Sequence, residues 1–204
     1  MNILSSFLLS LAINVDTLKF CFSSNTAKST FFKFKTLFIS LFTSLMTFSA
    51  MCLGKLIDIY FTKNLSNIFG AVLLGFIGVY YIIEHIRKEK DKAGYDTSFY
   101  VKDFEKHKNI IDLENYSENY TSLKQTVNVS FALSLNNIWP GIAGSLTNIN
   151  MCFTLLFNFL VCYLFFIISR FVKNKSYIDF IKSYHYLIAS IILISLCFIE
   201  NLFF

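Results

Sequence analysis

The sequence predicts an all-α integral membrane protein with six transmembrane helices, arranged as two inverted three-helix repeats. Three observations predict this fold: the apolar composition, the spacing of six apolar runs, and a similarity between the two halves of the chain. Of the 204 residues, 55% are hydrophobic and 25 are phenylalanine. A soluble domain of this size does not bury so much apolar surface, whereas a multi-pass membrane protein exposes it to the lipid bilayer. The bilayer is therefore the first expected partner.

The six apolar runs are each close to the ~20 residues that an α-helix needs to cross a hydrocarbon core of about 30 Å. They cover residues 3–22, 36–53, 68–86, 125–147, 152–169 and 184–203. The first run is not a typical signal peptide, because it has no basic start and no small-residue cleavage site and contains Asp16. We therefore expect it to be a membrane span.

Basic residues between the runs predict the orientation. They concentrate in the 23–35, 87–122 and 170–183 segments, whereas the opposite side has only Lys55 and Lys63. The positive-inside rule then places both termini outside the cytoplasm, in a multi-pass protein of the cell membrane. The same clustering beside apolar runs explains the net charge of +5 without a nucleic-acid partner.

The chain divides into a first three-helix repeat (1–86), a hydrophilic cytoplasmic loop (87–122) and a second three-helix repeat (123–204). The segment from Leu11 to Asp16 resembles the one from Phe131 to Asn136, 120 residues later. Three is an odd number of spans, so the second repeat is inverted relative to the first. Many secondary transporters have this architecture and bind their substrate at the repeat interface, near the bilayer midplane.

No catalytic motif is readable from the sequence. There is no phosphate-binding glycine loop, no nucleophile elbow and no zinc-protease motif. The five cysteines lie within or at the ends of apolar runs, which argues against a disulfide framework. We therefore expect no enzyme and no firmly bound cofactor.

The fourth apolar run contains a predicted helix break. Pro140, the only proline, has no N–H for the carbonyl of Asn136, four residues earlier. In a membrane such a carbonyl needs protein, water or a ligand as its partner. Together with the side-chain oxygens of Asn136 and Asn137 it suits a hard cation. A plain kinked packing helix is the alternative.

Asp16 is the most informative single residue. It lies about thirteen residues into the first run, roughly 20 Å deep at 1.5 Å per residue. A carboxylate at that depth is costly and is a functional hypothesis by default. We predict a metal site built from Asp16, Asn14, Asn136 and Asn137. A neutral carboxyl that serves packing is the alternative, and Lys19 either pairs with Asp16 or reaches the interface.

Two further acids, Glu84 and Glu200, end the third and sixth runs 116 residues apart. Either they are ordinary interfacial acids, or they line opposite mouths of a transport path. The sequence leaves both interpretations open.

These residues resemble the MntP/YtaF family. The resemblance rests on Asn14-Val-Asp16 in the first run and on the segment from Ala132 to Asn137 in the fourth, which is closer to the YtaF branch of sporulation membrane proteins. The MntP branch implies manganese export with essential acids in spans one and four. Asp16 matches the first acid, and Asn136 stands where the second would be.

The resemblance thus implies a divalent cation transporter with an intramembrane site at the repeat interface and Mn²⁺ as the transported ion. The alternative is a non-transporting sporulation membrane protein with a structural or partner-binding role, which the missing second acid and Lys19 favour. The sequence indicates no oligomeric state.

Overall fold

The computed structural model describes residues 2–23, 32–92, 123–172 and 175–202. These segments are helical except for short connections and contain no strand. The helices are α1 (Asn2–Ile13), α2 (Val15–Ser23), α3 (Phe32–Asp58), α4 (Lys63–Lys92), α6 (Leu123–Leu135), α7 (Ile138–Leu146), α8 (Met151–Phe171) and α9 (Lys175–Leu202).

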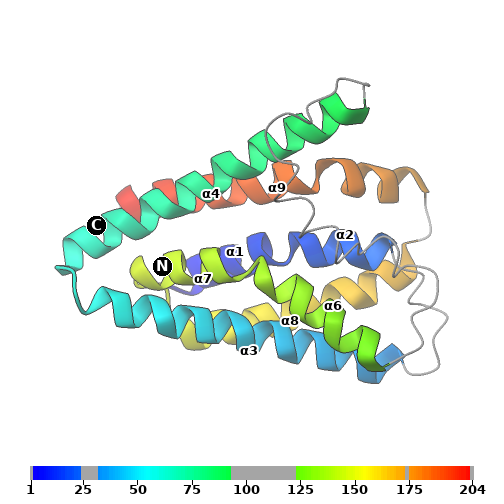
Figure 1. Cartoon of the computed structure of the whole chain (residues 1–204), viewed down its shortest axis with the longest axis horizontal. Helices are drawn as coiled ribbons and strands as arrows, with labels where there is room; N and C mark the ends of the chain where they lie inside the picture. The colour runs from blue at the N-terminus through cyan, green and yellow to red at the C-terminus, as the bar shows by residue number, and fades with distance from the viewer. Residues whose placement is uncertain (1, 24–31, 93–122, 173–174, 203–204) are drawn as a thin grey trace.

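The helices run along one long axis as a bundle (Figure 1). The pair α4 and α9 forms one side of the bundle, and α3 and α8 pack together on the other. Helices α1, α2 and α7 lie between these pairs: α1 and α2 contact α8 and α9, and α7 contacts α3 and α4. The start of α1 and the end of α9 lie at the same end of the bundle.

Four of the described helices are long and apolar enough to cross a membrane: Phe34–Asp58, Lys63–Lys90, Met151–Phe171 and Ser176–Asn201. The pair α1 and α2, bent by 41° at its break, would make a fifth span. The predicted all-helical membrane fold is therefore confirmed, but the count of six spans is not. Within 125–147, α6 and α7 are each too short to cross alone.

The predicted break in the fourth run is present, because α6 ends at Leu135 and α7 begins at Ile138. Pro140 occupies the first turn of α7, where the missing N–H costs no intrahelical hydrogen bond. A second break, at Asn14, was not predicted, since no proline or glycine marks it. There the Asn14 side chain donates to the Ser10 carbonyl (2.8 Å), which also accepts from the Asn14 backbone N–H. Such side-chain competition with the backbone bends helices.

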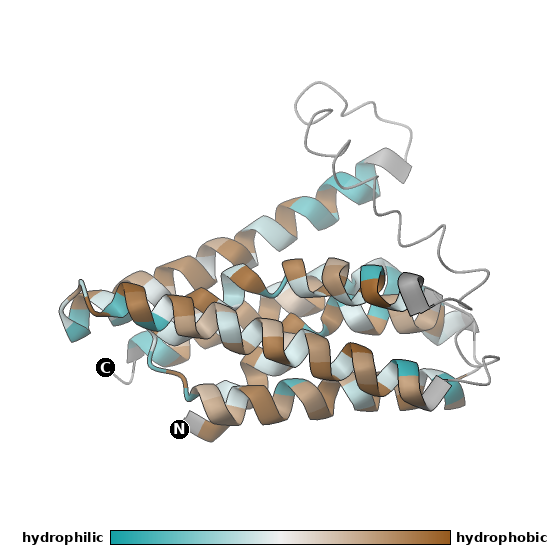
Figure 2. Ribbon diagram, turned by 60° about the horizontal axis from the view of Figure 1, so that its bottom comes forward, coloured by the Kyte–Doolittle hydropathy of each residue, from teal (hydrophilic) through white to brown (hydrophobic). Residues whose placement is uncertain are grey.

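The outer surface of the bundle is apolar and its interior is partly polar. Leu37, Leu41 and Leu45 form one exposed stripe along α3, while Ser40 and Thr43 of the same helix are fully buried. Figure 2 shows apolar, brown colouring along most of the length of the described helices. This distribution is the expected one for helices surrounded by lipid, where small hydroxyl residues mediate helix packing.

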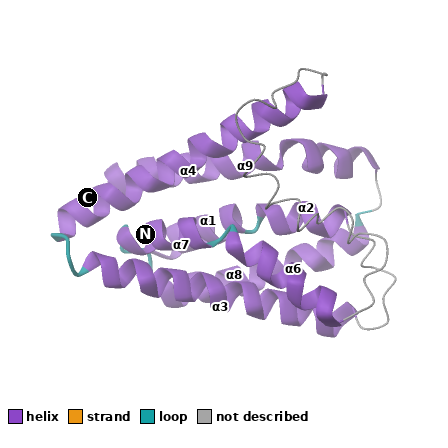
Figure 3. Ribbon diagram, in the orientation of Figure 1, coloured by secondary structure: helices purple, strands orange, loops and turns teal. Residues whose placement is uncertain are grey.

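The first residues of the predicted hydrophilic segment are helical. Helix α4 continues through Lys92, and ion pairs from Glu84 to Arg87 (3.8 Å) and to Lys88 (3.7 Å) support this extension. Figure 3 shows α4 as one continuous helix up to the part that is not described, and the division of the chain at 87 stays a prediction. Residues 93–122 lie outside the described residues, and so does Lys28 in the earlier basic segment.

Two glycines allow α7 to pack closely against α3 and α4. A Cβ atom on Gly54 of α3 would lie 2.6 Å from the Ile142 carbonyl oxygen. A Cβ on Gly70 of α4 would lie 2.8 Å from both the Ala143 carbonyl oxygen and the Thr147 nitrogen. Both obstacles are backbone atoms of the α7 segment, which cannot rotate away.

We expect Gly70→Ala to lower stability by about 1–3 kcal/mol, because α7 must shift away from α4. The measurement is the thermal unfolding midpoint of the protein purified in detergent. Gly75→Ala is the matched control, since its Cβ would meet only the flexible Cys197 side chain, at 3.3 Å. Equal midpoints for the two variants would contradict this packing.

Candidate functional site

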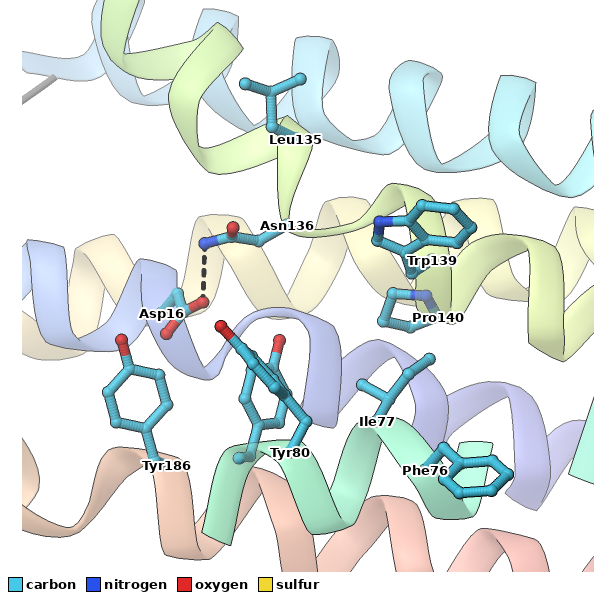
Figure 4. Close-up of a pocket in the computed structure, with 10 residues that line it drawn as sticks. Asp16, Phe76, Ile77, Tyr80, Leu135, Asn136, Trp139, Pro140 and Tyr186 are labelled. Atoms are coloured by element: carbon cyan, nitrogen blue, oxygen red, sulfur yellow. Dashed lines mark hydrogen bonds between the residues drawn. The ribbon is translucent and has the colours of Figure 1, made fainter. Parts of the chain in front are cut away.

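Asp16 and Asn136 meet in a pocket at the two helix breaks. The Asn136 Nδ2 atom donates to Asp16 Oδ2 at 2.9 Å, as Figure 4 shows. The pocket has a volume of about 590 Å³. Its lining is mostly aromatic and aliphatic, and includes Tyr80, Tyr81, Trp139 and Tyr186. Two residues that are 120 positions apart thus share one concave, largely apolar site.

The helix breaks determine where these two side chains lie. Asp16 is in the first turn of α2, where the positive end of the helix dipole favours an ionised carboxylate. Asn136 lies in the turn after α6, whose C-terminal carbonyl groups carry partial negative charge. The first helical bond of α7 runs from the Gly141 N–H to the Asn137 carbonyl at 3.0 Å, so Asn136 lies outside α7 and its side chain is free to turn toward Asp16.

Tyr186 connects the pocket to the charged end of α4. Figure 4 shows its phenol pointing toward Asp16. Its hydroxyl accepts a hydrogen bond from Lys88 Nζ at 2.9 Å, and Lys88 lies 3.7 Å from Glu84. The Lys88 ammonium also lies 4.4 Å from the Tyr186 ring centroid. Polar groups therefore continue from the pocket toward the end of the bundle where α4 ends.

Asn14 and Asn137 face a different environment from Asp16 and Asn136. Asn14 Nδ2 donates to Asn158 Oδ1 of α8, and Asn137 Nδ2 donates to Thr47 Oγ1 of α3 (3.2 Å). Asn158 Nδ2 in turn donates to Thr47 Oγ1 at 2.8 Å. These four buried side chains, which we call the amide cluster, link both helix breaks through the bundle interior.

The structure thus divides the four predicted ligands into two pairs. Asp16 and Asn136 line the pocket, whereas Asn14 and Asn137 belong to the amide cluster. Asn158 and Thr47 were not among the predicted ligands. The available signal for Asn158 was that it is the one amide in the otherwise apolar α8 sequence.

The pocket offers a hard cation few protein ligands. Among the described residues, no group of three or more His, Cys, Asp or Glu side chains could hold a metal ion. A cation would find the Asp16 carboxylate and, after rotation of the amide, the Asn136 Oδ1 atom. One negative charge and neutral oxygens give weak binding, because affinity rises with ligand charge.

Glu84 and Glu200 lie apart from the pocket. Both are buried, and they occupy opposite ends of the antiparallel pair α4 and α9. Glu84 forms the ion pairs with Arg87 and Lys88 described above. The Glu200 backbone carbonyl accepts from Asn67 Nδ2 at 3.3 Å. Lys19 is half-buried on α2, one turn beyond Asp16.

Comparison with known proteins gives one family match. The model of the family described as "Mntp: Putative manganese efflux pump" matches residues 36–199, most of the chain. The matched range includes Asn136, Asn137, Glu84 and Asn158 and begins after Asp16. It does not distinguish the YtaF branch. No curated protein and no solved structure matches the chain. From the extent of the family match, this helical chain with its apolar spans belongs to the Mntp family.

Proposed function

We propose that this protein carries Mn²⁺ across the cell membrane, with the Asp16–Asn136 pocket as its binding site. The family supports manganese as the cargo and export as the direction. The contact between Asp16 and Asn136 is the observation that carries the proposal. An intramembrane carboxylate is expected to serve ion passage rather than packing when it faces a pocket with polar groups.

The same contact supports two inverted repeats with six spans, of which the first and fourth are broken. Asp16 and Asn136 are equivalent positions of the proposed repeat, and equivalent positions meet near a two-fold axis. Two pairs of helix contacts have the same relation: α1 packs on α8 as α6 packs on α3, and α2 packs on α9 as α7 packs on α4. Broken helices around a central site are common in transporters with inverted repeats.

Both termini are proposed to lie outside the cytoplasm. Lys88 and Lys90 lie near the end of α4, and Arg170 lies near the end of α8. These helix ends lie opposite the start of α1 and the end of α9 (Figure 1). The positive-inside rule makes that end cytoplasmic. Glu84 would then lie on the cytoplasmic side of the route and Glu200 on the opposite side.

Expression in a host that lacks its own manganese exporter tests the function. We expect the protein to lower cellular manganese and to restore growth under manganese load, because export relieves the accumulated ion. Asp16→Ala should remove the rescue. Labelling of an amino-terminal tag on intact cells verifies insertion and tests the proposed orientation in the same experiment.

The second candidate function is a structural or partner-binding role without transport, as in sporulation. One observation favours it: among the described residues that line the pocket there is a single carboxylate, with Asn136 in place of another acid. If the unmodified protein and the Asp16→Ala variant both insert correctly but neither changes cellular manganese, the result would support this alternative and contradict manganese export.

A further inference from the structure

The amide cluster contains one oxygen that has no partner. Asn14 is fully buried, and its Oδ1 atom accepts no hydrogen bond. A buried, unsatisfied amide oxygen costs about 1–3 kcal/mol in proteins and more in a membrane. A ligand that supplies positive charge to this oxygen would remove the cost.

The hydrogen bonds fix the orientation of the Asn14 amide. Its Nδ2 atom donates both to the Ser10 backbone carbonyl (2.8 Å) and to Asn158 Oδ1. Rotating the amide would direct Oδ1 at the Ser10 carbonyl, which is always an acceptor. The nitrogen therefore belongs on this side, and the oxygen must find its partner elsewhere.

The donors of Asn158 and Thr47 already have partners. Asn158 Nδ2 donates to Thr47 Oγ1 (2.8 Å) and, at 3.5 Å, to the Thr43 carbonyl. The Thr47 hydroxyl donates to the same carbonyl at 2.9 Å. Asn137 Nδ2 donates to the Thr47 hydroxyl. The Asn14 Oδ1 atom is therefore an acceptor for which no neighbouring donor is left. A cation can satisfy this oxygen directly, whereas a water molecule can do so only by donating a hydrogen bond.

We propose that the amide cluster binds a monovalent cation, Na⁺, with Asn14 Oδ1 as a ligand. The cluster's side chains are all neutral, which suits a single charge better than a double one. In transporters with broken helices, half-helix ends and freed carbonyl groups commonly coordinate Na⁺.

The Na⁺ site is adjacent in sequence to the manganese pocket at both breaks. Asn14 is two residues before Asp16, and Asn137 follows Asn136. Occupancy of one site therefore biases the geometry of the other, and the effect is reciprocal. This use of Na⁺ as the coupling ion rests on the proposed manganese transport, whereas Na⁺ binding itself does not.

Thermal unfolding of the purified full chain tests the binding. Replacing choline chloride by NaCl at constant ionic strength should raise the unfolding midpoint by about 5 °C once Na⁺ is well above its dissociation constant. Asn14→Leu should abolish this shift. Asn67→Leu is the matched control, because Asn67 is also buried with an unpartnered Oδ1 but lies outside the amide cluster. It should keep the shift.

A second variant keeps the test decisive if Asn14→Leu does not fold. Asn14→Asp adds a negative charge to the site and should lower the half-saturating Na⁺ concentration by about tenfold. A midpoint that responds equally to choline and Na⁺ in the unmodified protein would overturn the proposal. So would an Asn14→Asp variant with unchanged Na⁺ dependence.

Manganese flux into proteoliposomes separates the two claims. Na⁺-dependent flux that Asn14→Asp shifts to lower Na⁺ concentration supports coupling. If Na⁺ raises the unfolding midpoint but manganese flux does not depend on Na⁺, only the coupling of the two ions is overturned. A Na⁺ shift in stability with no flux under any ion gradient overturns the proposed transport function and leaves the Na⁺ site intact.

Discussion

Asp16→Asn is expected to reduce manganese transport by about 100-fold or more while leaving the fold intact. The substitution preserves the size of the side chain and its capacity to bond Asn136, but it removes the only carboxylate that the described part of the chain contributes to the pocket. Loss of an outer-shell partner alone costs about 10–100-fold in metal affinity, and loss of the charged ligand should cost more. The measurement is manganese efflux from loaded cells or flux into proteoliposomes.

Asp58→Asn is the matched control for that experiment. Asp58 is an acid at the end of α3, paired with Lys55 at 2.7 Å and remote from the pocket residues. We expect near-normal flux from this variant. Comparable losses in both variants would mean that general charge or folding, and not the pocket carboxylate, controls transport.

Asn136→Asp is expected to strengthen Mn²⁺ binding by about tenfold, which corresponds to ~1.4 kcal/mol. The new carboxylate would lie within hydrogen-bond distance of Asp16, because the present contact is 2.9 Å. Two acids balance the charge of a divalent ion. Without the ion the two carboxylates repel each other and share a proton, so stability should fall in metal-free buffer.

The Mn²⁺ dependence of the unfolding midpoint measures both effects of Asn136→Asp. Asn201→Asp is the control, because it adds the same charge to an exposed position of α9 outside the pocket. Unchanged Mn²⁺ affinity in Asn136→Asp, with the fold preserved, would show that the cation does not bind between these two residues.

The helical membrane fold and the helix break between α6 and α7 were predictable because their causes are local. Apolar runs of about twenty residues predict spans, and Pro140 removes a backbone donor at a defined distance. The break at Asn14 was not predictable in this way. It depends on an asparagine side chain that bends its own helix and bonds Asn158, a residue 144 positions away.

The division of the four predicted ligands into two pairs could not be predicted from the sequence either. Neighbouring residues such as Asn136 and Asn137 point in different directions at a helix break, and the direction follows from dihedral angles that composition does not specify. The pairing of Asp16 with Asn136 was accessible only because the repeat pattern related the two positions.

The amide cluster has a consequence for biosynthesis. Asn14 and Thr47 enter the bilayer early, but their hydrogen-bond partners are made later. Asn14 bonds Asn158, and Thr47 bonds both Asn137 and Asn158. Until α8 is inserted, these early polar groups must be hydrated or shielded by the insertion machinery. A nascent chain that stops after α4 therefore carries exposed signals for quality control, and assembly is complete only when both halves are made.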